Sequence, residues 1–258
     1  MKILKNILII IGIIIIIGAL GYLGYGYYKK LTEEVKNPIA TMEVENFGTI
    51  KIELYPDMAP NTVANFICLA NRGFYNGKVF HRTIPDFMIQ GGDKNGDGTG
   101  SPTLNDIKDN GGSEEYNIKG EFIANGFNQN TLKHEKGVIS MARADYSSLS
   151  STLTTKGYNS GGSQFFIMTE DNESLDGLYA AFGKVIEGMD IVEQIENVEV
   201  VTRDQNAEEG VDKPVNPPVI KSLTVDTFGV DYGVPETVEP FDYNSWITEN
   251  YGSAMPVE

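Results

Sequence analysis

Arg82, Phe87, Met88 and Gln90 lie close together in the stretch FHRTIPDFMIQGGD, and a second stretch, GSQFFI, adds residues 164–166. In a strand, residues two apart face the same side, so Met88 and Gln90 share a face. An arginine, a methionine, aromatic rings and amides are poorly suited to breaking bonds. They can hold a peptide in an apolar trough and contact its backbone. The alternative is that the apolar members are ordinary core, which is the default for any one of them alone.

Other chemistries fit the sequence poorly. The segment DKNGDG, residues 93–98, begins like a calcium loop, but the twelfth position holds Leu104 where a Glu is needed. His81 and His134 are the only histidines, and a single cysteine accompanies them, too few ligands for zinc. The motif GGSQF lacks the closing glycine of a nucleophile elbow, and no GK[ST] follows the glycines near DKNGDG. We therefore interpret DKNGDG as a turn and expect neither a metal nor a cofactor.

The charge of the chain limits its partners. The 258 residues carry a net charge of −16; residues 1–38 hold five lysines and two glutamates, a charge of +3, so the remainder carries −19. A strongly acidic body repels nucleic acid, so we expect no nucleic-acid partner. The single cysteine excludes an internal disulfide framework.

Residues 7–28 form a run of 22 uncharged residues, ILIIIGIIIIIGALGYLGYGYY. A helix of that length spans roughly 33 Å, enough for a hydrocarbon core of about 30 Å. The alternative is a signal peptide cleaved near residues 19–21, followed by secretion. The run continues past that position, which favours an uncleaved single-pass anchor in the cell membrane. The flanking charges specify orientation weakly, and export of the body is the simpler topology.

The body reads as short strands with two helices. Residues 39–55 alternate apolar and polar around a glycine, as in a β-hairpin. Pro60 and the apolar stripe that follows it predict a helix ending near Arg72, and a second helix is expected at Gly188–Asn197. Six further runs indicate strands: VFHRTI, DFMIQGG, GVISMAR, SQFFIMT, YAAFGKV and VIKSLTV. This pattern favours a closed or nearly closed antiparallel barrel.

Several motifs together resemble the cyclophilin-type peptidyl-prolyl isomerases, in particular the membrane-anchored or exported cyclophilins of Gram-positive bacteria. The motifs are FHRTIPDFMIQGGD, GDGTG, GEFIANGFNQNTLKHEKGVISMAR, GSQFFI and LDGLYAAFGKV. The resemblance implies a mainly β fold, a closed eight-stranded antiparallel barrel capped by two helices, with a proline groove on its outer face. The expected domains are an anchor at 1–30, a linker at 31–38, the isomerase domain at 39–230 and an acidic tail at 231–258.

The resemblance also implies roles for individual residues. Arg82 matches the catalytic arginine of the family. The matched substrate-binding positions are Phe87, Met88, Gln90, Ala142, Arg143, Gln164, Phe166, Leu175 and Tyr179. Arg143, Ser174 and Tyr179 depart from residues common in the family, Asn, Trp and His, and the missing Trp argues against tight cyclosporin binding. The Ser/Thr-rich segment 145–161 is longer than usual and is expected to form a flap beside the groove.

Catalysis of Xaa-Pro rotation by an arginine needs no general base, because the guanidinium is always charged. His81 is adjacent to Arg82 in a strand and is therefore expected to face the other side, as a structural residue. His134 is expected to be a loop or packing residue. The predicted function is a monomeric prolyl isomerase acting on unfolded or exported polypeptides. The alternatives are a proline-peptide-binding or chaperone module without catalysis, and a scaffold that acts through its tail.

Overall fold

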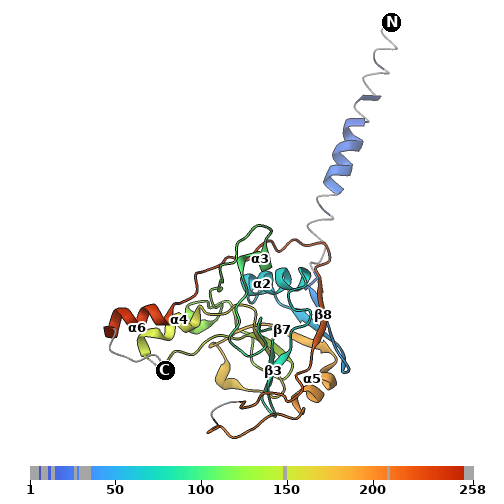
Figure 1. Ribbon diagram of the computed structural model, residues 1–258. Helices are drawn as coiled ribbons and strands as arrows, with labels where there is room; N and C mark the ends of the chain where they lie inside the picture. The colour runs from blue at the N-terminus through green and yellow to red at the C-terminus, as the bar shows by residue number, and fades with distance from the viewer. Residues whose placement is uncertain are drawn as a thin grey trace. The chain divides into compact units, whose positions relative to one another are not determined.

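The computed structural model describes residues 36–147, 150–207 and 210–252, and before them residues 6, 11–12, 15–25 and 28 (Figure 1). The chain divides into two compact units, Met1–Lys36 and Asn37–Glu258. Residues 15–25 of the first unit are helical. No helix among the described residues combines the length and the apolar character needed to cross a bilayer. The anchor predicted at 7–28 lies partly outside those residues.

The second unit is built on one antiparallel sheet of eight strands, in the order β3-β4-β6-β5-β7-β2-β1-β8. The strands are β1 (Ile39–Val44), β2 (Gly48–Leu54), β3 (Phe80–Ile84), β4 (Met88–Gly91), β5 (Val138–Met141), β6 (Phe165–Met168), β7 (Ala180–Glu187) and β8 (Ile220–Asp226). The predicted hairpin is confirmed as β1 and β2. Each of the six other predicted runs coincides with one observed strand, although β7 extends two residues and β8 one residue past its run.

The prediction of a closed barrel needs correction. The strand ladder ends at β3 on one side and at β8 on the other, so the eight strands form a half-barrel. The two edges approach each other at an isolated bridge between Val79 and Val219. Backbone hydrogen bonds from Phe80 to Pro218 and from Thr83 to Asp212 continue this seam. Pro218 and the turn at Asp212 keep the edges from forming a regular ladder, because proline has no N–H to donate.

Two helices cover the ends of the sheet, as the sequence predicts. Helix α2 (Pro60–Asn71) begins with a proline in its first turn and packs on β7 and β8, while α5 (Met189–Glu196) packs on β2, β3 and β4 (Figure 1). Six other helical segments in the described part of the chain were not predicted. They are α3 (Leu104–Ile107), η1 (Ile123–Asn125), η2 (Ser151–Leu153), α4 (Thr154–Tyr158), η3 (Glu173–Leu175) and α6 (Tyr243–Tyr251).

The central strands bury apolar side chains on both faces. All four residues of β5 and all four of β6 are buried. Along β6, Phe165 and Ile167 belong to the main core between the sheet and α2, whereas Phe166 and Met168 belong to a second cluster on the outer face. Because successive side chains point to opposite faces, β6 is a continuous apolar run and β5 is interrupted only by the buried Ser140.

Two segments outside the sheet lie together at one side of the half-barrel. They are the predicted flap at 145–161, which contains η2 and α4, and the C-terminal segment that leads into α6 (Figure 1). The Tyr146 and Phe241 rings are 5.5 Å apart, and Lys156 lies 5.6 Å from the Phe241 ring. The described part of the tail therefore lies along the domain surface.

Candidate functional site

Six of the predicted site residues gather in the apolar cluster on the outer face of the sheet, here called the outer cluster. They are Phe87, Met88, Ala142, Phe166, Leu175 and Tyr179. The rest of the outer cluster is Ile84, Leu132, Val138, Met168 and Ala181. Met88 and Phe166 are 2% and 6% exposed, while Phe87, Leu175 and Tyr179 are only partly buried. The cluster is thus an apolar surface with buried rings in its floor and half-exposed side chains above them.

A row of cross-strand neighbours leads from this cluster to Arg82. Arg82 pairs with Gln90, Gln90 with Phe166, and Phe166 with Ser140, across β3, β4, β6 and β5. Directly opposite residues in an antiparallel pair share a face, so Arg82 and Gln90 lie on the same side as the outer cluster. The arginine therefore lies at the edge of the apolar surface, two strands from Phe166.

A β-bulge turns Arg82 to this face. The register between β3 and β4 shifts between Phe80, which pairs with Gly91, and Arg82, which pairs with Gln90, so His81 is the extra residue. Phe80 belongs to the main core and is fully buried. Strict alternation would place Arg82 on the core side with Phe80; the extra residue moves it to the outer face. Within the described part of the chain, no hydrogen bond or ion pair involves the half-buried Arg82 guanidinium.

His81, the extra residue of the bulge, is buried, and its expected orientation away from the groove stays a prediction. It is 7% exposed, and a Cβ at Gly98 of the DKNGDG loop would lie 3.7 Å from its ring. Burial lowers the pKa of His81, and its Nδ1 has no hydrogen-bond partner in the structure. A neutral, enclosed imidazole at this position is a structural group that fills the space beneath the loop.

The amide side chains of the groove are held by a buried carboxylate. Gln90 Nε2 donates to Gln164 Oε1 at 3.0 Å, and Gln164 Nε2 donates to Asp93 Oδ1 and to the Gly98 carbonyl, both at 2.9 Å. The backbone N–H of Ala142 donates to the Gln164 carbonyl at 2.9 Å. These bonds fix both glutamine side chains, so that the groove presents preset polar groups beside its apolar floor.

The DKNGDG loop is a turn organised by the same carboxylate. Asp93 is fully buried and accepts hydrogen bonds from five backbone N–H groups, those of residues 95, 96, 97, 98 and 100. Both oxygens of the Asp93 carboxylate accept backbone N–H groups, and the positively polarised amide hydrogens would repel a cation such as calcium. The interpretation as a turn is confirmed for this loop. Among the described residues, no group of His, Cys, Asp and Glu side chains could hold a metal ion.

His134 lies under the outer cluster, in a role that the sequence did not specify beyond packing. Its ring is stacked on Phe166 at 6.1 Å and meets Tyr179 edge-on at 6.4 Å. Nδ1 lies 3.2 Å from Asp176 Oδ1, and Nε2 lies 3.0 Å from Ser140 Oγ. An ionised Asp176 accepts a hydrogen bond, so Nδ1 carries the proton and Nε2 accepts from the Ser140 hydroxyl.

The pKa shifts of His134 and Asp176 keep the His134 ring neutral and the Asp176 carboxylate charged. Burial lowers the pKa of His134, although the hydrogen bond with Asp176 opposes the shift. Burial alone would raise the pKa of Asp176, but hydrogen bonds from the backbone and ring of His134 and from Lys133 lower it. No sequence motif signals the contacts of His134, because Asp176 lies 42 residues away along the chain.

Arg143 does not project into the groove as a free side chain. Its Nε donates to the Leu178 carbonyl and its Nη1 to the Ala144 carbonyl, both at 3.0 Å. The guanidinium lies 4.5 Å from the Tyr179 ring centroid and 5.0 Å from that of Tyr158. Arg143 therefore ties a wall of the outer cluster to the segment 145–161, and its contact with substrate stays a prediction.

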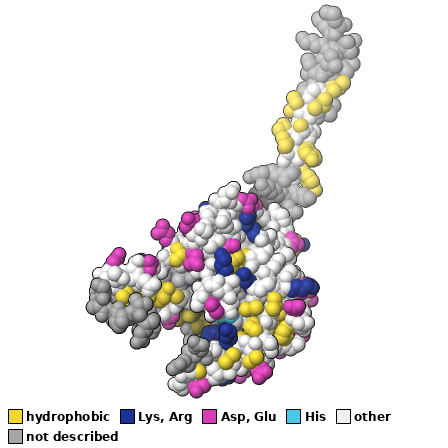
Figure 2. Space-filling view, viewed as in Figure 1, with side chains coloured by type: hydrophobic (Ala, Val, Ile, Leu, Met, Phe, Trp, Pro, Cys, Tyr) yellow, Lys and Arg dark blue, Asp and Glu magenta, His cyan; other side chains and the backbone are white. Residues whose placement is uncertain are grey.

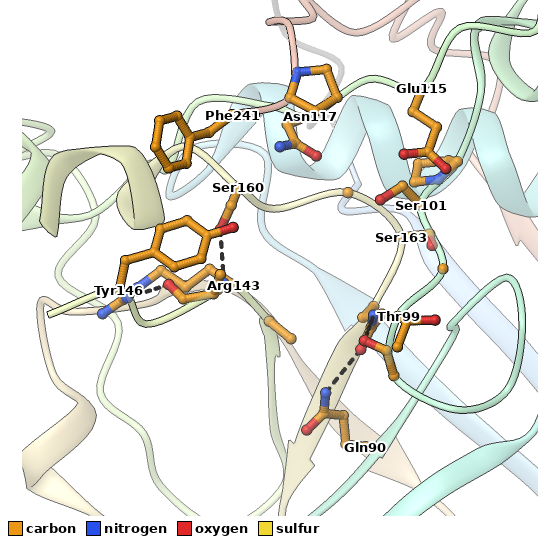
Figure 3. A pocket seen from close by; sticks show the side chains of 18 residues that line it. Gln90, Thr99, Ser101, Glu115, Asn117, Arg143, Tyr146, Ser160, Ser163 and Phe241 are labelled. Carbon is orange, nitrogen blue, oxygen red and sulfur yellow. Dashed lines mark hydrogen bonds between the residues drawn. The ribbon is translucent and has the colours of Figure 1, made fainter. Parts of the chain in front are cut away.

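A cavity of about 380 Å³ adjoins the groove at Gln90, Ala142 and Gln164. Figure 3 shows Tyr146 and Phe241 on one side of it and Glu115 and Ser101 on the other. Elsewhere, acidic side chains are spread over the visible face of the domain and interleaved with Lys and Arg (Figure 2). On that face, charge alone does not mark a binding surface.

Comparisons with known proteins agree on one family. Residues 39–225 match the family model described as cyclophilin type peptidyl-prolyl cis-trans isomerase/CLD. Peptidyl-prolyl cis-trans isomerase B of Bacillus subtilis (strain 168) is 40% identical over 158 residues, which are 61% of this chain and 90% of that protein. A peptidyl-prolyl cis-trans isomerase of Helicobacter pylori (strain J99) is 37% identical over 177 residues, 68% of this chain and 91% of that protein.

Solved structures include a similar fold. A cyclophilin type peptidyl-prolyl cis-trans isomerase of Cryptosporidium parvum, crystallised in the presence of the dipeptide Ala-Pro, superposes with a TM-score of 0.55 at 28% identity. The match covers 73% of this chain and 98% of that one.

Proposed function

This chain belongs to the cyclophilin-type peptidyl-prolyl cis-trans isomerases and catalyses rotation about Xaa-Pro bonds, and from that premise we propose that Arg82 supplies the catalytic hydrogen bond. The observation that carries the proposal is the position of Arg82: on the outer face, at the edge of the apolar cluster, with its guanidinium donors unused by other described residues.

The reaction needs a donor that acts on the twisted amide. Resonance gives rotation about the peptide C–N bond a barrier of about 18–20 kcal/mol, and Xaa-Pro bonds exchange over tens of seconds or more. In the transition state the resonance is lost and the prolyl nitrogen gains a lone pair. A guanidinium that donates to this nitrogen stabilises the twisted amide more than the planar one, which is the condition for catalysis. The bond is rotated and none is broken.

The outer cluster holds the proline ring while the rest of the peptide turns. Phe87, Met88, Phe166 and Leu175 supply the apolar surface, and the fixed side chains of Gln90 and Gln164 offer polar contacts to the peptide backbone. Contact with the ring is similar in the planar and twisted states, so these residues contribute chiefly to binding, whereas Arg82 contributes chiefly to turnover.

We further propose that the enzyme is tethered to the membrane, with the isomerase domain outside the cytoplasm. The support is the run of 22 uncharged residues at 7–28, flanked by lysines, and the resemblance to anchored or exported bacterial cyclophilins. Exported chains that pass this surface unfolded would then be its substrates. Protease accessibility in intact and lysed cells tests this topology: an isomerase domain protected in intact cells and cleaved only after lysis contradicts it.

The catalytic proposal is tested by NMR exchange on a Xaa-Pro peptide with the full chain in mild detergent. We expect Arg82→Ala to lower kcat/KM about 10²–10³-fold, as removal of a transition-state donor does elsewhere. Arg72→Ala is the matched control, because Arg72 forms an exposed ion pair with Asp109 remote from β3. Equal activity of the Arg82 variant and the wild type would refute the role of Arg82.

A further inference from the structure

The cavity beside the groove has a wall that the half-barrel does not supply. Gln90, Ala142 and Gln164 belong to both the groove and the cavity, so a peptide in the groove passes its opening. Tyr146 from the segment 145–161 and residues 240–241 from the C-terminal segment form the outer side (Figure 3). Two segments separated by almost a hundred residues in the chain therefore build one boundary of the space next to the substrate.

This wall is fixed to the domain. Val238 and Asn117 exchange two backbone hydrogen bonds, of 2.9 and 2.8 Å. Asn61 binds Glu236 twice, with its Nδ2 donating to the Glu236 carbonyl at 2.9 Å and its Oδ1 accepting from the Glu236 N–H at 2.7 Å. The residues before Pro240 are thus held in place on the half-barrel, and the tilted contact of the Phe241 ring with the Tyr146 ring continues this attachment.

The unpaired charge in the cavity wall is negative. Among its lining residues only Glu115 and Arg143 are charged. The guanidinium of Arg143 is satisfied by two carbonyl oxygens and by the faces of Tyr158 and Tyr179. Within the described part of the chain, no hydrogen bond or ion pair involves the Glu115 carboxylate, which is exposed. A ligand in the cavity therefore meets one free carboxylate opposite two aromatic rings.

We propose that Glu115, Tyr146 and Phe241 make this cavity selective for a lysine or arginine side chain of the substrate, at a position near the proline. The methylene stem would pack against Tyr146 and Phe241, and the cationic end would meet Glu115 and the ring faces. The acidic body of the domain draws cationic peptides in the same direction. This inference rests on the proposed function of the groove and adds a substrate class to it, namely basic residues flanking the proline.

The test compares Xaa-Pro peptides that carry Lys or Glu at each flanking position in turn. NMR exchange measures kcat/KM for each peptide with the full chain. We expect one position at which Lys is preferred over Glu by about fivefold, the size of one exposed ion pair with a ring contact. Preference at that position should weaken in high salt, because exposed charges are screened.

Three variants assign the preference to the cavity. Glu115→Gln and Phe241→Ala should each reduce the Lys-to-Glu ratio toward one. Glu114→Gln is the matched control, because Glu114 is a neighbouring exposed glutamate that does not line the cavity, and it should keep the ratio. If Phe241→Ala loosens the C-terminal segment, Glu115→Gln still tests the charge alone.

Equal rates for Lys and Glu peptides at every position would overturn the subsite, as would a preference that persists in Glu115→Gln. Both results leave the proposed function standing if the acceleration still depends on Arg82. Absence of any Arg82-dependent acceleration would instead remove the premise itself.

Discussion

Phe165 and Phe166 are neighbours in β6, yet they belong to two different environments. Phe165 is fully buried in the main core. Its ring centroid lies 5.7 Å from that of Phe66, 5.6 Å from that of Tyr75 and 6.2 Å from that of Phe80. Phe166 faces outward and is 6% exposed, among partly buried side chains and above His134. The same residue type thus serves a closed core on one face and an open apolar surface on the other.

Side chains are buried in this sheet for two different purposes. The inner face is covered by α2, so its side chains are fully enclosed and contribute to folding. The outer cluster has half-exposed members and lies beside a charged side chain, Arg82, as a binding surface requires. Removing an apolar side chain from the inner face should therefore lower stability, whereas removing one of equal hydrophobicity from the outer cluster should chiefly lower substrate affinity.

The largest effect on stability is expected from the inner ring. Phe165→Ala should lower the free energy of unfolding by about 3–5 kcal/mol, because it leaves a cavity in a closed core. Phe166→Ala should cost about 2 kcal/mol, since the outer cluster is incompletely covered, and should raise KM about tenfold through lost contact with the proline ring. Urea unfolding and NMR exchange measure both quantities. Similar stability losses in the two variants would abolish the distinction between the faces.

An intermediate effect is expected at Asp93, which connects the loop to the groove. Asp93→Ala removes the acceptor of five backbone N–H groups and of Gln164 Nε2, and should lower the free energy of unfolding by about 2 kcal/mol. KM should also rise, because Gln164 loses a partner. Asp97→Ala is the control, since the exposed Asp97 carboxylate accepts hydrogen bonds only from Thr99. An unchanged unfolding free energy in Asp93→Ala would mean that the loop needs no such anchor.

The smallest effect on stability and binding is expected from a change in pH, and His81 and His134 should respond to it differently. Burial lowers the pKa of His81 and of His134, so the unfolded chain binds more protons than the folded one below the ordinary His pKa of about 6.5. Stability should fall as the pH drops through that value. His134 faces Asp176, with Lys133 beyond it, and lies under Phe166, so its protonation should also weaken peptide binding. Protonation of His81 should not.

The measurement is peptide Kd and unfolding free energy between pH 8 and pH 5.5. We expect the pH dependence of Kd to be reduced in His134→Gln and retained in His81→Gln. If the pH dependence of Kd is the same in both variants, protonation of His134 does not affect peptide binding in the groove.

Much of the fold could be predicted from the sequence. The hairpin at 39–55, both main helices and all six later strands follow from periodicity and from glycine and proline positions. Met88 and Gln90 share a face as their spacing predicts, because no irregularity separates them in β4. The resemblance supplied the list of site residues, and six of them meet in the outer cluster.

Other features could not be predicted, for physical reasons. The bulge at His81 adds one residue to one strand, and an alternation pattern cannot reveal it because the partner strand is needed to define the register. Strands buried on both faces have no alternation, so the sequence does not indicate which of Phe165 and Phe166 lies outside. The contacts of His134 and the docking of residues 236–241 depend on positions far apart in the chain.

The central claim is that Arg82 controls turnover and the outer cluster controls binding. The most direct measurement is NMR exchange that resolves Kd from the cis–trans rate of the bound peptide, for wild type, Arg82→Lys and Phe166→Leu. We expect Arg82→Lys to slow the bound-state rate with Kd nearly unchanged, because lysine lacks the planar donor set. Phe166→Leu should raise Kd and largely keep the rate. An Arg82→Lys variant with weaker binding and an unchanged bound-state rate would contradict the account.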